Sequence, residues 1–323
     1  MRFLWHRDKE NEPPRVDEIS GRMIKTDKPC LLFAVPILLG SLVVTGCGPA
    51  VAMTTPSVTS ASVDALTPPL RPSLTQTPHP TLTSTASPTP GVPDTGWERL
   101  RPGLERRTIN LLGDTGEPFE HLFMLRLEPD DYQFDVAYHP DARTLEAWQS
   151  ETNALIVLNG GYFRGESGAY VPNGLTVVGG GAIGSTYGEF AGMFAVTGDG
   201  PELRWLAQEP YDPNEPLLAA LQSFPVLVKP GGVVGFPVQD EDHRAARRSV
   251  IAEDRNGRVL FIVASRGSFT LHRLSAYLVA SDLDLHIAIN LDGGPSSGLL
   301  LASPLEEVPA LGPLPIVITV LDR

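Results

Sequence analysis

The sequence predicts an α+β fold: a single globular domain with a mixed β-sheet core and packed helices, placed after a disordered tether. Strand-like segments outnumber helix-like segments, and the two kinds do not alternate one for one as they would in a doubly wound fold. The region before the domain is dominated by Thr, Pro and Ser and has almost no aromatic residues. Such a segment cannot bury enough apolar area to offset the entropy lost on ordering.

The composition limits the possible classes of function. The chain has 323 residues, of which 42% are hydrophobic, and a formal net charge of −13. This length suffices for one sizeable core, and the acidic balance argues against a nucleic-acid partner, because phosphate binding needs clustered Lys and Arg. The only cysteines, Cys30 and Cys47, lie near the start. Neither a disulfide framework nor a cysteine-based metal site can therefore form in the body of the protein.

The N-terminal segment has the features of an export signal. A basic flank precedes an apolar run over residues 30–47 that ends in small residues. The sequence Val44-Thr45-Gly46-Cys47 resembles the lipobox of bacterial lipoproteins, in which Cys47 becomes the lipidated first residue. The run is short for a transmembrane helix, so we expect an exported protein, lipid-anchored at the outer face of the bacterial cell membrane. Met23 is an alternative start to Met1 and would give a leader of ordinary length.

These features divide the chain into three expected parts. Residues 1–46 form the lipoprotein signal segment, residues 47–95 the Thr/Pro/Ser-rich disordered linker, and residues 96–323 the globular domain. We interpret the linker as an extended tether between membrane and domain. A glycosylated stalk is an alternative with the same role. The sequence indicates no oligomeric state.

The first half of the domain is predicted to be mostly strands. Residues 121–129 and 132–139 have strand character and are expected to pair through a turn at Pro129-Asp130-Asp131. Leu145 and Trp148 have helical spacing, which predicts a helix within 141–152. The wholly apolar stretch 154–159 is typical of a buried strand. Further strands are expected over 175–178, 192–197 and 202–206.

The second half contains two predicted helices and the remaining strands. Residues 215–223 are predicted to be helical and 224–229 to form a strand. Arg255-Asn256-Gly257 favours a tight hairpin turn between two strands, because Asn-Gly adopts the primed turn types. A second helix is expected over 270–281, with Thr270 as its N-cap. The other strands are expected over 248–254, 258–265, 286–291 and 315–321.

One short motif resembles the nucleophile elbow of serine hydrolases. Residues 294–298 fit the pattern G-x-S-x-G, with Ser296 at its centre. An α/β-hydrolase needs a histidine after this serine, whereas the last histidine of the chain is His286. Other orders of the catalytic residues exist on other folds, so a serine hydrolase remains a minor alternative.

A second motif matches the dinucleotide-binding fingerprint. Gly179, Gly181 and Gly184 fit G-x-G-x-x-G, but this fingerprint must open a helix. The residues that follow, 185–192, are glycine-rich and lack helical spacing. We therefore expect a glycine turn between two strands.

Metal binding is weakly indicated. The histidines are scattered, and no H-E-x-x-H pair occurs. A calcium or magnesium ion held by the acidic loop 238–243 stays an open alternative, although a solvated charged loop is the favoured interpretation. No cofactor is expected to be required.

Two apolar strands end in polar residues followed by paired glycines. The first gives Asn159-Gly160-Gly161-Tyr162-Phe163, and the second, 290–297, includes Asp292-Gly293-Gly294. Glycine pairs let backbone amides approach a ligand closely, and successive N–H groups can form an anion-binding nest. Tyr162 and Phe163 offer flat apolar faces that suit sugar rings.

A pair of arginines completes this constellation. Arg247 and Arg248 directly precede a predicted strand, and a guanidinium matches a phosphate with two hydrogen bonds. Either glycine motif alone is also an ordinary turn former. Together with the arginines they predict a site for an anionic ligand with an apolar face, such as a sugar phosphate.

The stretches NGGYF, PNGLTV, LQSFPVLVKPGG, RRSVIA and NLDGGPSS follow one another in this order along the chain. Their order and spacing resemble the phosphodiester glycosidase family, which includes the lysosomal uncovering enzyme (N-acetylglucosamine-1-phosphodiester α-N-acetylglucosaminidase) and bacterial relatives. The resemblance runs from about Leu104 to Asp322. The family's Arg-Thr-Ala-Ile-Gly appears here as 248–252, Arg-Ser-Val-Ile-Ala. Its Asp-Gly-Gly-Gly-Ser appears with Pro295 in the fourth place, which removes one N–H donor.

The resemblance implies a surface-tethered hydrolase that cleaves the glycosidic bond of sugar-1-phosphodiesters, such as N-acetylglucosamine-1-phosphodiesters. It implies that Arg248 and the Gly293-Gly294 amides hold the phosphate, and that Asp292 is a base or stabilises an oxocarbenium ion. Asn159 and Asn173 would hold sugar hydroxyls, and Tyr162 or Phe163 would stack on the ring. We expect Asn159, with Asp292 and Arg248, to be a catalytic residue. The other expected substrate-binding residues are Gly160, Gly161, Gly174, Asn290, Ser296 and Ser297.

The expected partners are thus a carbohydrate phosphodiester and, through the lipid on Cys47, a membrane. A non-catalytic glycan-binding or envelope-assembly lipoprotein that kept the same fold is the alternative function.

Overall fold

A computed structural model describes residues 93–113 and 116–323 of the chain. The predicted signal segment, Cys47 and nearly all of the predicted linker lie outside these residues. Within the described residues, no helix is long and apolar enough to cross a membrane.

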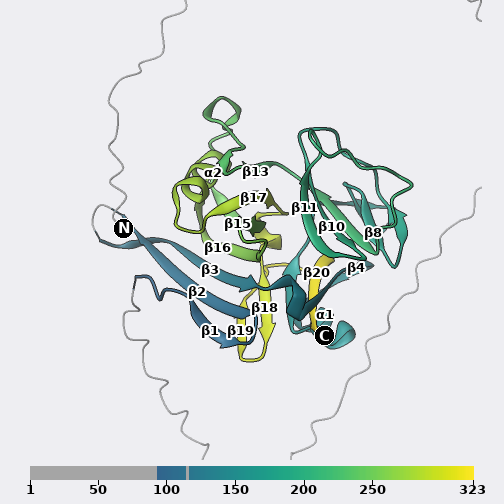
Figure 1. The fold of residues 1–323 in the computed structure, drawn as a ribbon, viewed down its shortest axis with the longest axis horizontal. Coiled ribbons are helices and arrows are strands. Elements are labelled where there is room, and N and C mark those ends of the chain that lie inside the picture. The colour runs from purple at the N-terminus through teal and green to yellow at the C-terminus, as the bar shows by residue number, and fades with distance from the viewer. Residues whose placement is uncertain (1–92, 114–115) are drawn as a thin grey trace, which may run out of the picture. The chain divides into compact units, whose positions relative to one another are not determined.

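Three large β-sheets, one two-stranded sheet and two α-helices form the described domain (Figure 1). An eight-stranded sheet has the order β1-β2-β3-β16-β15-β17-β13-β14, and two five-stranded sheets have the orders β11-β10-β12-β8-β9 and β19-β18-β5-β20-β4. Strands β6 and β7 form a separate pair. All strand pairs of the described residues are antiparallel, and the one parallel contact among them is an isolated bridge between Gly174 and Ser185. The domain is therefore mostly β, with antiparallel rather than mixed sheets.

The elements have the following bounds. The helices are α1 (Leu145–Thr152) and α2 (Leu271–Ala280). The strands of the first half are β1 (Glu98–Arg101), β2 (Leu104–Leu112), β3 (Pro118–Leu127), β4 (Tyr132–Arg143), β5 (Ile156–Asn159), β6 (Phe163–Glu166), β7 (Ala169–Pro172), β8 (Thr176–Val178), β9 (Gly181–Ile183) and β10 (Gly192–Thr197). Those of the second half are β11 (Gly200–Trp205), β12 (Ala219–Ser223), β13 (Val226–Lys229), β14 (Val233–Val234), β15 (Ala246–Asp254), β16 (Val259–Phe269), β17 (Leu285–Asn290), β18 (Leu299–Ala302), β19 (Leu305–Val308) and β20 (Leu314–Asp322).

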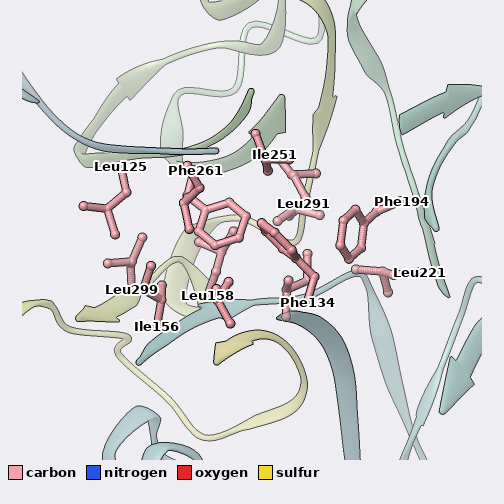
Figure 2. Close-up of a cluster of buried hydrophobic side chains, with 14 of the residues drawn as sticks. Leu125, Phe134, Ile156, Leu158, Phe194, Leu221, Ile251, Phe261, Leu291 and Leu299 are labelled. Atoms are coloured by element: carbon pink, nitrogen blue, oxygen red, sulfur yellow. The ribbon is translucent and has the colours of Figure 1, made fainter. Parts of the chain in front are cut away.

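The inner faces of the three sheets meet in one hydrophobic core (Figure 2). Phe134 of β4 packs edge to face against Phe194 of β10 at 6.3 Å between ring centroids, and against Phe261 of β16 at 6.4 Å. These three rings come from three different sheets. Burial of such aromatic rings stabilises the contact between the sheets, so the strand ends that border this core are held firmly in place.

The two helices cover outer faces of the sheets. Helix α2 packs on the outer face of the eight-stranded sheet, and α1 on the outer face of the sheet that contains β5 and β20. Each helix has a threonine N-cap, and the predicted cap at Thr270 is confirmed, since its Oγ1 accepts a hydrogen bond from Arg273 N–H at 3.3 Å. Trp148 anchors α1 by donating from Nε1 to the Leu314 carbonyl at 2.8 Å.

The predicted helix over 215–223 is wrong, because this segment contains strand β12, Ala219–Ser223. All five residues of the strand are buried, and it pairs with β10 on one side and β8 on the other. A central strand that is covered on both faces has a continuous apolar sequence. The same apolar run also has helical spacing, so periodicity alone could not separate the two structures.

The predicted hairpin around Pro129-Asp130-Asp131 is also wrong, although both of its strands exist. Strand β3 pairs with β2 and β16 in the eight-stranded sheet, while β4 pairs with β20 in another sheet. The three turn residues form a short 3-10 helix that carries the chain from one sheet to the other.

Two other predicted turns are confirmed. Gly257 has φ of +80° in the turn that joins β15 to β16. Gly179 and Gly180 have φ of +56° and +76° in the turn between β8 and β9, so the residues that match a dinucleotide fingerprint form a glycine turn between two strands. Helix α1 and the other predicted strands are also present.

Candidate functional site

The ends of strands β5 and β17 lie next to each other although they belong to different sheets. Asp292 N–H donates to the Gly160 carbonyl at 3.0 Å, and Asn159 N–H donates to the Gly298 carbonyl at 3.1 Å. The two glycine loops that the sequence analysis singled out are therefore in direct contact. We call the loop after β5, residues 159–163, the first glycine loop and the loop after β17, residues 291–298, the second glycine loop.

Asn159 joins the two loops through its side chain, which is 1% exposed. Its Nδ2 donates to the Asp292 carbonyl at 2.8 Å and to the Gly160 carbonyl at 3.3 Å, while Oδ1 accepts from Gly298 N–H at 3.1 Å. Both ends of the amide are thus engaged with backbone groups. This geometry differs from the expected contact of Asn159 with a sugar hydroxyl.

Gly160 and Gly161 are required by close packing. A Cβ at Gly160 would lie 2.7 Å from Cγ2 of Ile316, and a Cβ at Gly161 would lie 3.1 Å from the Gln222 carbonyl. The N–H of Gly160 donates to the Ile316 carbonyl at 2.9 Å. These glycines let the first glycine loop fit between β20 and β12, and the Gly160 amide is not free for a ligand.

Asp292 is a partly buried carboxylate at the start of the second glycine loop. Its Oδ1 accepts a hydrogen bond from Gly293 N–H at 2.9 Å, and its side chain also accepts from the Ser296 hydroxyl. Burial raises the pKa of Asp292 above its usual range, and the hydrogen bonds from Ser296 and Gly293 partly oppose this shift. The expected use of the Gly293 amide for phosphate therefore competes with a hydrogen bond inside the loop.

Arg248 places a buried cation beside this loop. The residue is 8% exposed, and it donates from Nε to the Phe269 carbonyl at 3.3 Å and from Nη2 to the Arg244 carbonyl at 2.7 Å. No carboxylate of the described residues forms an ion pair with it. A buried charge without a counter-charge is costly, so the arrangement favours binding of an anion.

The packing of Gly293 against Arg248 explains this glycine. A Cβ on Gly293 would lie 3.6 Å from Nη1 and 3.8 Å from Cδ of Arg248, and 3.0 Å from the Arg247 carbonyl. Burial lowers the pKa of Arg248, although the acidic residues Asp242 and Glu241 act in the opposite direction. Arg247 points elsewhere, because its Nη2 donates to the Pro309 carbonyl at 2.7 Å. Of the two arginines, Arg248 is therefore the one that belongs to the site.

Four aromatic rings form a wall beside the carboxylate. Phe224 is central, with ring-centroid distances of 4.6 Å to Tyr162, 5.1 Å to Tyr187 and 5.5 Å to Phe190. Burial raises the pKa of Tyr162 strongly, and the negative charge of Asp292 adds to the shift. The phenol is therefore neutral, and a hydrogen bond from Asn290, at the end of the strand that leads to Asp292, holds it at the site.

Phe163 does not join this wall. Its ring packs edge to face on Tyr170 at 5.3 Å, and it is partly buried against the central core. Of the two rings expected to stack on a sugar, Tyr162 is therefore the one that lies beside Asp292.

Asn290 holds Tyr162 in position. It is fully buried, and its Nδ2 donates to Tyr162 Oη at 2.8 Å, to the Phe224 carbonyl at 3.1 Å and to the Leu291 carbonyl at 2.7 Å. Its Oδ1 is buried and has no partner among the described residues. Asn290 thus connects the aromatic wall to the second glycine loop by hydrogen bonds.

Asn173 borders the site on the side of Tyr187. Its N–H donates to the Tyr162 carbonyl at 2.8 Å, and its Oδ1 accepts from Arg164 Nη1 at 3.2 Å. A Cβ on Gly174 would lie 2.5 Å from Cε2 of Tyr187, so only glycine lets this ring approach. Asn173 is partly exposed.

The two serines of the second glycine loop differ. Ser296 is partly exposed and donates to Asp292. Ser297 is fully buried, and its hydroxyl has no partner among the described residues. Gly294 lies in the chain between Asp292 and these serines. Its φ is +60°, and a Cβ there would meet open space. The loop is therefore open to a ligand at Gly294.

No group of three or more His, Cys, Asp or Glu side chains that could hold a metal ion occurs in residues 93–113 and 116–323. In the acidic loop 238–243, Glu241 accepts from the Thr270 hydroxyl and from His243 N–H, and Asp242 accepts from Arg244 N–H. These bonds stabilise the loop beside Arg248.

A cavity of about 420 Å³ adjoins the site behind Tyr162 and Phe224. Its walls are mostly aromatic and aliphatic, with three charged residues. The lining residues are Tyr162, Phe190, Trp205, Phe224, Pro225, Val226, Lys229, Gly235, Phe236, Asp240, Asp242 and Leu271.

The sequence analysis assigned no role to Tyr187, Phe190, Gln222 or Phe224, although the structure places them at the site. Gln222 is fully buried and accepts from Tyr187 N–H at 2.7 Å, which fixes that ring in the wall. Gln222 and Phe224 lie within one of the stretches that carry the family resemblance, and this was the only available signal. The contacts join segments far apart in the sequence and follow no spacing rule.

The chain is similar to one known family and to several solved structures. The family model described as "Phosphodiester glycosidase" matches residues 152–315, which span both glycine loops and Arg248. The catalytic domain of zebrafish N-acetylglucosamine-1-phosphodiester α-N-acetylglucosaminidase, auto-inhibited by its pro-peptide, is similar in structure, with a TM-score of 0.54 and 16% identity over 69% of this chain and 85% of that chain. At this identity the match shows a shared fold.

Two further solved structures are less similar. A hypothetical protein from Synechocystis has a TM-score of 0.47 and 13% identity, over 69% of this chain and 62% of that chain. A putative exported protein from Burkholderia pseudomallei has a TM-score of 0.46 and 12% identity, over 62% of this chain and 74% of that chain. No curated protein matches the sequence significantly.

Proposed function

Because the chain belongs to the phosphodiester glycosidase family, we propose that it is a surface-tethered hydrolase that cleaves the glycosidic bond of sugar-1-phosphodiesters. N-Acetylglucosamine-1-phosphodiesters are the proposed substrate class. The observation that carries this proposal is that Arg248 and Asp292 occur together at the second glycine loop. Arg248 is a buried cation without an ion-pair partner among the described residues, and Asp292 is a carboxylate whose pKa is raised by burial.

The proposed phosphate site consists of Arg248 and the Gly294 amide. Arg248 already uses Nε and Nη2 on backbone carbonyls, which orients the guanidinium and leaves Nη1, next to Gly293, to meet phosphate oxygens. The open position at Gly294 lets a phosphate approach the loop. Donors that are fixed before the reaction stabilise developing negative charge without reorganisation.

Asp292 is the proposed general base. Water attacks the anomeric carbon, and its proton passes to the Asp292 carboxylate. The bond between the anomeric carbon and the phosphate oxygen breaks, and the phosphomonoester leaves with the electron pair. A phosphate is a good leaving group, so strong help from a general acid is not needed. A carboxylate with a raised pKa is a stronger base than an ordinary one, and in its ionised form it also stabilises positive charge on the sugar ring.

The sugar is proposed to lie between Asp292 and the wall formed by Tyr162 and Tyr187. The amide of Asn173 would hold a hydroxyl of the ring, and Tyr162 would cover its apolar face. We assign Asn159 a positioning role, because its amide fixes the backbone of Asp292. The lipid anchor at Cys47 and location at the outer face of the bacterial cell membrane are part of the proposal, and no cofactor is required by these steps.

The first test is hydrolysis of a panel of sugar-1-phosphodiesters, including N-acetylglucosamine-1-phospho-methylmannoside. The chain from residue 47 onward would be used with Cys47→Ser, which prevents lipidation. We expect sugar release by this protein and its loss in Asp292→Asn, with folding verified by circular dichroism. Asp199→Asn is the matched control, because Asp199 is an exposed aspartate away from the site.

The outcomes separate the alternatives. Full activity in Asp292→Asn would refute the role of Asp292. Absence of release across the panel, together with binding on a glycan array, would favour the non-catalytic glycan-binding function. Labelling of Ser296 by a fluorophosphonate would instead favour a serine hydrolase.

A further inference from the structure

The cavity behind Tyr162 and Phe224 is not used by any step described above. We propose that it binds the group esterified to the far side of the phosphate, and that this group is a hydrocarbon chain or ring rather than a second sugar. The proposal rests on the proposed function and names the class of aglycone: a phosphate-linked apolar alcohol. The protein would then release a sugar from an amphipathic phosphodiester and leave an alkyl or aryl phosphate.

The position of the cavity relative to Arg248 supports this assignment. Leu271 lines the cavity and lies two residues after Phe269, whose carbonyl accepts from Arg248 Nε. Asp242 also lines it, and its charge affects the pKa of Arg248. The sugar-site residues Asp292 and Asn173 are not among the lining residues, and neither is Arg248 itself, so the cavity adjoins the phosphate site only through residues 242 and 269–271. A phosphate on Arg248 would then have the sugar-binding residues on one side and, on the other, the segments around Phe269 and Asp242 that lead to the cavity.

Phe224 lies between the proposed sugar site and the cavity. Its ring contacts Tyr187, which lies outside the cavity lining, and also Phe190, which is part of the lining. Tyr162 belongs to both compartments, since it lines the cavity and its pKa responds to Asp292. A substrate that spans the phosphate would thus place one substituent on each side of this pair of rings.

The chemistry of the lining favours a hydrocarbon. The walls contain the rings of Phe190, Trp205 and Phe236 together with aliphatic side chains, and the two carboxylates of the lining, Asp240 and Asp242, belong to exposed residues. The ammonium of Lys229 lies 4.7 Å from the centroid of the Trp205 ring, where it makes a cation–π contact. A second sugar would bury several hydroxyl groups, each of which needs a hydrogen-bond partner, whereas a hydrocarbon needs none. The cavity is also of the size that small-molecule sites have, roughly 300–1,000 Å³.

Exposed apolar side chains continue from the cavity to the surface. Phe190 is 59% exposed and forms part of the lining. Val234 and Val238 flank the lining residues Gly235 and Phe236 in the chain, and they are 38% and 60% exposed. Exposed apolar residues gathered at one place mark an interaction surface. A chain longer than the cavity could therefore continue along this rim.

The test measures binding of alkyl phosphates, which does not depend on turnover. Methyl, n-butyl and n-octyl phosphate would be titrated by calorimetry into the chain from residue 47 onward with Cys47→Ser. Each methylene moved from water into apolar surroundings raises affinity about fourfold. We expect n-butyl phosphate to bind at least about tenfold more tightly than methyl phosphate.

Variants locate the effect. Phe190→Ala and Phe236→Ala should reduce the ratio of n-octyl to methyl phosphate affinity several-fold, while methyl phosphate binding, which reports the fold and the Arg248 site, is retained. The matched control is Leu305→Ala, because Leu305 is an exposed leucine, 75% exposed, at the start of β19. It should leave the ratio unchanged. Lys229→Met should also keep the ratio, because the aliphatic part of the side chain remains.

Equal affinities for the three alkyl phosphates would overturn the proposal, as would tighter binding of mannose 6-phosphate than of n-butyl phosphate. A large loss of the chain-length effect in Lys229→Met would show that the occupant is recognised by charge and would also overturn it. Failure of the proposed function is distinguishable, because it would appear as absent sugar release while the chain-length effect on binding persists.

Discussion

The two glycine loops have almost the same sequence pattern but different structural roles. In the first, after β5, the asparagine amide is fully engaged, and a Cβ on either glycine would come too close to Ile316 or Gln222. In the second, after β17, Gly294 adopts a left-handed conformation in open space, and Asp292 has a raised pKa. The first loop therefore supports the second, and the second carries the proposed chemistry. The comparison teaches that such a motif becomes a site only where the fold leaves room around its backbone.

The largest expected effect is on activity, at the second loop. Arg248→Met removes the proposed phosphate contact, and we expect kcat/KM for a sugar-1-phosphodiester to fall about 10²–10³-fold. The measurement is steady-state hydrolysis with a circular dichroism melt of the same sample. Arg99→Met is the control, because Arg99 is an exposed arginine on β1, and it should behave as the unmodified chain. A folded Arg248→Met variant with unchanged kcat/KM would contradict the phosphate role.

The first loop should respond in stability instead. Asn159→Ala removes the hydrogen bonds to Asp292 and Gly298 and leaves buried backbone groups without partners. We expect the free energy of unfolding to fall by about 2–4 kcal/mol. Urea denaturation of the variant checks this value. An unchanged free energy of unfolding in Asn159→Ala would contradict the supporting role of the first glycine loop.

The glycines offer the same contrast at a smaller scale. Gly160→Ala would place a Cβ 2.7 Å from Cγ2 and 3.0 Å from the carbonyl oxygen of Ile316, and overpacking of this kind costs about 1–3 kcal/mol. Gly294→Ala meets no atoms but must keep φ of +60°, at a cost of about 1–2 kcal/mol. We expect the first variant to lose mainly stability and the second to lose more activity than stability. Melting curves and kcat/KM of both variants decide between these patterns, and identical behaviour of the two would remove the distinction between the loops.

A pH effect is expected from Ser296. Its hydroxyl donates to the Asp292 carboxylate and holds the pKa of Asp292 lower than burial alone would. Ser296→Ala removes this bond, so the pKa rises further and the base is ionised only at higher pH. The acid limb of the kcat/KM profile should therefore move to higher pH, with little change at alkaline pH. A profile that keeps its position would show that a group other than Asp292 controls the acid limb.

The smallest effect concerns the two aromatic residues of the first loop. Phe163 packs on Tyr170 and the core, whereas Tyr162 lies beside Asp292. We expect Tyr162→Leu to raise KM and Phe163→Leu to lower the melting temperature slightly with KM unchanged. Measurement of KM for both variants on one substrate is sufficient. An increase in KM for Phe163→Leu would restore Phe163 as a stacking residue.

Much of the fold could be predicted from local patterns, because alternating or continuous apolar runs mark most of the strands that the structure contains. Where two structures share one pattern, prediction failed, as in β12, whose apolar run also fits a helix. The predicted pairing of strands also failed in one case, because β3 and β4 follow each other in the chain but lie in different sheets. A short turn gives a hairpin only when the two strands that it joins also pair with each other. Whether they do so depends on tertiary packing.

The candidate site could also be predicted only as far as short local motifs indicate it. Asp292, Arg248 and Tyr162 occur in short motifs with recognisable chemistry, and the structure brings them together. The engagement of Asn159 and the positions of Tyr187 and Phe190 depend on contacts between distant segments, as with Gln222 and Tyr187. Such contacts leave no periodic signal in a single sequence.

The most direct test of the central proposal is hydrolysis of an N-acetylglucosamine-1-phosphodiester in water enriched in heavy oxygen, followed by mass spectrometry of both products. Attack at the anomeric carbon, assisted by Asp292, predicts that the heavy oxygen enters the released sugar and that the phosphomonoester stays unlabelled. Heavy oxygen in the phosphomonoester would mean that the bond to phosphorus is cleaved instead. That result would contradict the proposed glycosidase chemistry of the second glycine loop.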